Sequence, residues 1–193
     1  MPGKLNPLAV LIGGYALSNK TPFYEPFPTE MTAMSFSTPN RIIEFLRAIG
    51  LTVEPRDLPN PTFLPGILIE QGKIYYDLEK LDYPGDLLHE AGHLAVVPGV
   101  DRCSFGPDVG DDGGLEMAAI AWSYAACLFI GLPVETVFHE AGYRGESDCL
   151  LSNFAEGRYL GVPILEWRGM AVQKKAGRNE GPFYPTMKKW LCD

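Results

Sequence analysis

Cysteine is scarce in this chain of 193 residues, and its four cysteines form no CxxC pair. A domain of this size buries enough apolar surface to fold without disulfide bonds, so we expect free thiols in a reducing compartment. Basic residues are also few, because 16 Lys and Arg stand against 24 Asp and Glu, which gives a net charge of −8. An acidic chain binds nucleic acid or an anionic membrane surface poorly, so we expect neither as a partner.

The sequence also lacks a long apolar run that is free of helix-breaking residues. The uncharged segment 5–19 is interrupted by Pro7, and the uncharged segment 117–134 by Gly131 and Pro133. A membrane-spanning helix needs about 20 consecutive apolar residues, and an export signal needs an unbroken apolar stretch. We therefore expect no membrane span, no export signal and a cytoplasmic location.

Apolar stripes and turn residues together predict an α+β fold with helices and strands in separate parts of the chain. Helices are predicted over residues 39–49, with Thr38 as the N-cap, and over 84–96, 115–130, 133–142 and 147–160, and a loop over residues 99–114. Two short apolar segments around Gln71-Gly72 predict a β-hairpin, and a further short strand is predicted at 51–54. We interpret residues 1–193 as one domain, in which a small antiparallel sheet packs against the helices and residues 158–193 form a basic tail.

One motif in the chain carries metal chemistry. His89-Glu90-Ala91-Gly92-His93 has the pattern HExxH, and it accounts for two of only three histidines. At about 100° per residue, His89 and His93 lie within about 40° of each other on a helix, so both imidazoles can reach one metal ion. Glu90 lies beside them, close enough to act on a metal-bound water without being a ligand. The apolar residues of the motif fall on the opposite arc, which a helix would bury.

A catalytic zinc site needs a third protein ligand, and a carboxylate is the candidate because no histidine follows at the expected spacing. Glu116 stands near the start of an otherwise apolar helix, 23 residues after His93. A buried carboxylate is costly unless it is paired, and a metal ion would remove that cost. Asp111 or Asp112 as the ligand, or a capping role for Glu116 at the helix N-terminus, are the alternatives.

With these residues, the chain resembles the zincin metallopeptidases of the gluzincin type, and more narrowly the ImmA/IrrE-like peptidases. The resemblance rests on the HExxH motif, on Glu116 at the start of the next helix, and on the order hairpin, HExxH helix, apolar helix over about residues 67–133. It implies a zincin-like fold that binds Zn²⁺ through His89, His93 and Glu116, with Glu90 as the general base. The Asn that is usual in the family's second helix has no counterpart here.

The function expected from these residues is hydrolysis of a peptide or protein substrate by zinc-activated water, with Glu90 taking the proton. A second donor is needed for the oxyanion, and we take His139 as the candidate, with Tyr143 and Arg144 as alternatives. A zinc-binding regulatory or stress-response protein with little or no proteolytic activity is the main alternative function. A helix-turn-helix module formed by residues 133–142 and 147–160 is a weaker one. The oligomeric state stays open.

Overall fold

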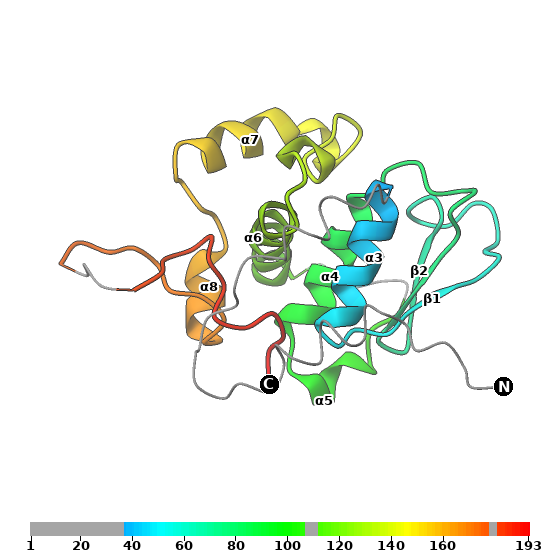
Figure 1. Cartoon of the computed structure of the whole chain (residues 1–193), viewed down its shortest axis with the longest axis horizontal. Helices are drawn as coiled ribbons and strands as arrows, with labels where there is room; N and C mark the ends of the chain where they lie inside the picture. The colour runs from blue at the N-terminus through cyan, green and yellow to red at the C-terminus, as the bar shows by residue number, and fades with distance from the viewer. Residues whose placement is uncertain (1–36, 107–111, 178–180) are drawn as a thin grey trace, which may run out of the picture.

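The computed structural model describes residues 37–106, 112–177 and 181–193 (Figure 1). The segment 5–19 and Asp111 lie outside these ranges. The α+β class is confirmed. Along the described ranges of the chain, one helix precedes the three strands of a small sheet, and the other helices follow them. The elements are α3 (Thr38–Ala48), β1 (Val53–Pro55), β2 (Ile67–Glu70), β3 (Lys73–Tyr76), α4 (Asp86–Val96), α5 (Gly99–Arg102), α6 (Gly113–Phe129), α7 (Ser147–Ala155) and α8 (Val162–Trp167), with single 3₁₀ turns at Val134–Thr136 and Tyr143–Gly145.

The predicted hairpin forms, but the sheet is mixed and not antiparallel throughout. β2 pairs antiparallel with β3, and Gln71 and Gly72 form the turn with φ of 52° and 72°. Positive φ at both turn residues is the geometry that matches the twist of a two-residue hairpin. β1 then pairs parallel to β3, which gives the order β1-β3-β2. The prediction of an antiparallel sheet is therefore wrong. β3, the most buried strand, takes the central place, and β1, which precedes the loop of residues 56–66, pairs along its other edge.

Helix ends largely follow the turn residues of the sequence. α3 begins one residue earlier than its predicted first residue, with Ser37 as the N-cap, and Gly50 follows it with φ of 101°. α7 is shorter than predicted, because Gly157 at φ 74° ends it and a separate helix, α8, follows. A positive φ beyond the last turn is a common helix stop.

The helix predicted over residues 133–142 does not form. Only Val134–Thr136 makes a 3₁₀ turn there. The cause is packing against α4, since a Cβ atom built on Gly85 would lie 1.7 Å from the Thr136 carbonyl oxygen. The chain therefore runs tightly over the start of α4 instead of continuing as a helix. Without this helix, the helix-turn-helix pair of the weaker alternative is not formed.

α3 and α4 lie between the sheet and α6, and α7 and α8 lie at opposite sides of α6 (Figure 1). α4 and α6 meet at Gly92, whose backbone lies against Ala119 of α6. The C-terminal residues return to these helices, because the Trp122 Nε1–H donates to the Trp190 carbonyl at 2.9 Å and the Cys192 N–H donates to the Ala95 carbonyl at 2.8 Å. The described residues thus share one hydrophobic core around α4 and α6. None of the described helices combines the length and the apolar character needed to cross a membrane.

Candidate metal centre

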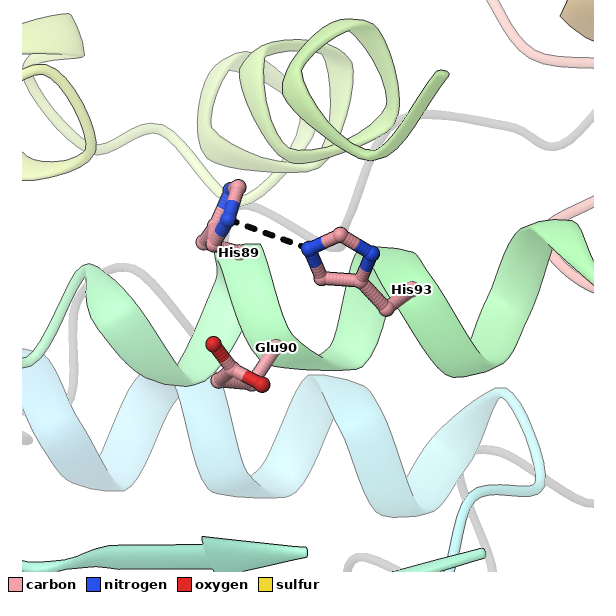
Figure 2. A group of neighbouring side chains, drawn as sticks. All are labelled: His89, Glu90 and His93. Carbon is pink, nitrogen blue, oxygen red and sulfur yellow. Dashed lines mark hydrogen bonds between the residues drawn. The ribbon is translucent and has the colours of Figure 1, made fainter. Parts of the chain in front are cut away.

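α4 places His89 and His93 on one face, one helical turn apart. Their Nε2 atoms lie 3.2 Å from each other, and the two rings stand at 89° (Figure 2). The His93 side chain is 3% exposed and that of His89 is 13% exposed. At this distance one neutral imidazole can donate its N–H to the other, and the two ring nitrogens are also close enough to bind one metal ion together.

The third member of the cluster is Glu116, the acid predicted from the sequence. α6 brings its Oε1 to 3.5 Å from His89 Nε2 and its Oε2 to 3.2 Å from His93 Nε2. Zinc–nitrogen and zinc–oxygen bonds of about 2.0–2.1 Å at tetrahedral angles separate neighbouring ligand atoms by about 3.3 Å. The observed separations, between the two imidazole nitrogens and from each of them to a different oxygen of the Glu116 carboxylate, are close to this spacing, so the donor set fits this ion.

The sequence left open which acid faces the histidines and which one caps α6. In the structure these are two different residues, Glu116 and Asp112. The Asp112 carboxylate caps α6, because its Oδ1 accepts from the Gly114 N–H at 2.8 Å and from the Leu115 N–H at 3.2 Å. Glu116, one turn further along, is left to face the histidines. The structure thus gives Asp112 the capping role that was the alternative for Glu116.

The charges in the cluster suit metal binding. Burial, helped by the neighbouring His93, lowers the pKa of His89 to about 4, so its imidazole is neutral at pH 7 and a ring nitrogen is free to ligate. The hydrogen bond with His93 lowers the pKa of Glu116 in spite of partial burial, and the charge of Arg144 acts in the same direction. A neutral imidazole at His89 and an ionised carboxylate at Glu116 are protonation states that a zinc ion requires of its ligands.

Glu90 lies beside the two histidines, and its carboxylate comes within 4.8 Å of their ligand atoms (Figure 2). It is 8% exposed, and burial raises its pKa to about 7. A carboxylate with a pKa near the working pH is suited to accept and return a proton. Glu90 also borders a pocket of about 170 Å³ whose other walls are apolar side chains of β2 and the preceding loop, including Pro59, Pro61, Phe63, Leu64, Ile67 and Ile69.

The structure brings the three predicted residues of the motif together with Glu116 of α6. His139 instead pairs with Asp86. His139 Nε2 lies 2.9 Å from Asp86 Oδ1, and its ring stacks on Tyr83 with the centroids 4.0 Å apart. Asp86 is one turn before the motif on the same face of α4. This spacing was visible in the sequence, but our sequence analysis did not name Asp86 as a residue beside the site. Tyr143, named only as an alternative donor, lies against His89, with its hydroxyl 3.3 Å from His89 Nδ1.

Three comparisons with known proteins gave no match: no protein family, no curated protein and no solved structure is similar enough to this chain to assign it. The interpretation of the site therefore depends on its own geometry.

Proposed function

We propose that the protein is a cytoplasmic zinc-dependent metallopeptidase, with His89, His93 and Glu116 as the ligands of the ion. The observation that carries the proposal is the cluster of two imidazole nitrogens, 3.2 Å apart, and the Glu116 carboxylate, whose oxygens lie 3.5 and 3.2 Å from them, beside a buried carboxylate of raised pKa. A purely structural cluster does not need a proton acceptor tuned to pH 7 next to three such ligand atoms. Three protein ligands leave a fourth position for water or substrate, as in catalytic zinc sites.

Bound zinc supplies a Lewis acid that polarises a substrate carbonyl and lowers the pKa of water at the open position toward about 7. Glu90 takes a proton from the attacking water and passes it to the leaving amine as the peptide bond breaks. The pocket shields the Glu90 carboxylate from bulk water. This burial maintains the raised pKa that the proton transfer needs. The same apolar pocket supports binding of a peptide side chain beside the bond to be cut.

The role of His139 as donor to the oxyanion stays a prediction. In the structure its Nε2 faces Asp86, and its Nδ1 is buried without a hydrogen-bond partner among the described residues. Proteolysis that persists in His139→Gln at the wild-type rate would remove His139 from the catalytic set.

The test compares the zinc-loaded protein with Glu90→Gln in cleavage of a peptide library. The chain supplies a matched control, because the same tetrapeptide His-Glu-Ala-Gly recurs at 139–142 with an exposed glutamate, Glu140. Glu90→Gln should keep its zinc and lose about 10²- to 10⁴-fold in turnover, the usual contribution of a general base. Glu140→Gln should match the wild type.

Two outcomes would contradict the proposal. Equal cleavage by wild type and Glu90→Gln would show that the activity does not arise at this site. Stoichiometric zinc with no cleavage by any variant would favour the zinc-binding regulatory protein, which shares the metal site and lacks the chemistry.

A further inference from the structure

Tyr143 contacts the metal cluster from the side that faces away from its ligand atoms. Its hydroxyl lies 3.3 Å from His89 Nδ1, and its ring stands edge-on to the imidazole at 87° with the centroids 5.3 Å apart. Nδ1 and Nε2 are on opposite edges of an imidazole ring, and Nε2 is the atom that faces His93 and Glu116. The hydroxyl is therefore behind His89 and does not face the open side of the site.

The backbone around Tyr143 adopts a costly conformation to hold the ring there. Tyr143 and Arg144 have φ of 53° and 55°, so two consecutive residues that are not glycine lie in the left-handed region. Each such residue costs about 1 kcal/mol or more and persists only where the surroundings impose it. The Ser147 hydroxyl fixes the segment by donating to the His139 carbonyl at 2.6 Å, and the bond between His139 and Asp86 ties it to α4.

The hydrogen bond between the Tyr143 hydroxyl and His89 has a defined direction once His89 ligates a metal ion. If Nε2 of His89 binds the ion, the lone pair of Nε2 is used there, and a neutral imidazole then carries its proton on Nδ1. The Tyr143 hydroxyl, 3.3 Å from Nδ1, is placed to accept this Nδ1–H.

This direction of donation has a consequence for His89. A neutral imidazole whose proton is held on Nδ1 presents the lone pair of Nε2 to the other ligand atoms. His93 is different, because its Nδ1 has no hydrogen-bond partner among the described residues. Within the part of the chain that the structure describes, the two histidines of the motif are thus not equivalent, because a side chain from outside the cluster contacts the Nδ1 of His89 but not that of His93.

We propose that Tyr143 is a positioning residue of the metal site, which fixes the tautomer and the ring orientation of His89 by accepting its Nδ1–H. The proposal rests on the proposed metal site but not on proteolysis. Removing a partner that orients a histidine ligand typically lowers metal affinity 10- to 100-fold. Tyr143 thereby differs from the oxyanion donor that the sequence suggested, because it acts through His89.

The experiment measures zinc affinity by competition with a chromogenic chelator, in the wild type, Tyr143→Phe and Tyr124→Phe. Tyr124 supplies the control, because it is part of the same aromatic cluster through Phe138 and contacts none of the three ligands. Tyr143→Phe should bind zinc about 10-fold or more weakly, and the visible bands of its cobalt-substituted form should shift. Tyr124→Phe should match the wild type in both measurements.

Each remaining outcome has a defined meaning. Wild-type zinc affinity and an unchanged cobalt spectrum in Tyr143→Phe would overturn the positioning role, and a loss of turnover alone would make Tyr143 a catalytic residue instead. If Tyr143→Phe does not fold, the Nδ1–H of His89 in the zinc-loaded wild type should give an NMR signal that exchanges slowly with solvent, because the Tyr143 hydroxyl accepts it, and fast exchange would overturn the proposal. A wild type that binds no zinc would instead refute the proposed function.

Discussion

A single methyl group added at Gly92 should disturb both the stability of the protein and its metal site. Gly92 lies between the two histidines of α4 at the point where α4 and α6 touch. A Cβ atom there would lie 2.9 Å from the Ala119 carbonyl oxygen, 3.1 Å from its Cα and 3.2 Å from its Cβ. Real Cβ contacts are essentially never shorter than 3.0 Å, and most of these neighbours are backbone atoms that cannot rotate away. In Gly92→Ala, α6 must therefore move away from α4 by a few tenths of an ångström.

Two opposing effects set the size of the change in stability. Alanine is favoured over glycine in a helix interior by about 0.8–1 kcal/mol. Overpacking a close-packed contact costs about 1–3 kcal/mol. The difference between these two figures leaves overpacking ahead, so we expect Gly92→Ala to lower the free energy of unfolding by up to about 2 kcal/mol, where the helix preference alone would raise it.

The metal site should be affected more than the fold. Glu116 is on α6 one turn before Ala119, so a shift of α6 lengthens the separations of 3.5 and 3.2 Å between its carboxylate and the two histidines. Ligands must be held to within about 0.5 Å of their productive places. We expect zinc to bind on the order of 10-fold more weakly to Gly92→Ala.

The measurements are urea unfolding of the metal-free protein and zinc competition with a chelator. Gly113→Ala is the control, since a Cβ at this position at the start of α6 meets no atom within 4 Å. It should leave zinc binding unchanged and should not lower stability. A Gly92→Ala variant that is more stable than the wild type and binds zinc as tightly would show that the contact between α4 and α6 does not set the geometry of the site.

Two further predictions concern the carboxylates. Glu116→Gln keeps the shape of the side chain but loses an anionic ligand, so zinc affinity should fall by ~100-fold or more in chelator competition, and an unchanged affinity would exclude Glu116 as a ligand. In the metal-free protein the raised pKa of Glu90, about 7 against 4.5 in the unfolded chain, means that the folded state keeps a proton which the unfolded state has already released. Stability should therefore fall as pH rises from about 4.5 through 7, and Glu90→Gln should be more stable than the wild type by about 1–3 kcal/mol at pH 8 but not at pH 4. Urea unfolding at both pH values with chelator present measures this, and a difference that does not change with pH would contradict it.

Local patterns were enough to predict the parts of the fold that depend on local geometry. The hairpin follows from Gln71-Gly72 between two apolar segments, and α4 follows from the periodicity of the HExxH motif and its flanking Pro and Gly residues. Glu116 was also predicted to lie beside the histidines, from the cost of burying an unpaired charge. The structure places it there but leaves its side chain 43% exposed, so this cost is smaller than the sequence suggested. The other arguments need only the helical period and turn residues.

Features that depend on contacts between distant segments were not predictable in the same way. The parallel pairing of β1 with β3 depends on which strand becomes the central one. The missing helix at 133–142 depends on the close approach of Thr136 to Gly85. The hydroxyl of Tyr143 reaches His89 through a left-handed backbone at residues 143 and 144, which no propensity favours.

The central claim is that one metal ion is held between His89 Nε2, His93 Nε2 and the Glu116 carboxylate. X-ray diffraction from crystals of the zinc-loaded protein, measured on both sides of the zinc absorption edge, tests it most directly. Our account predicts a single strong anomalous peak within bonding distance, about 2.0–2.2 Å, of all three groups. No peak at this place, or a peak bound elsewhere while the two imidazoles and the carboxylate remain bonded only to one another, would contradict it.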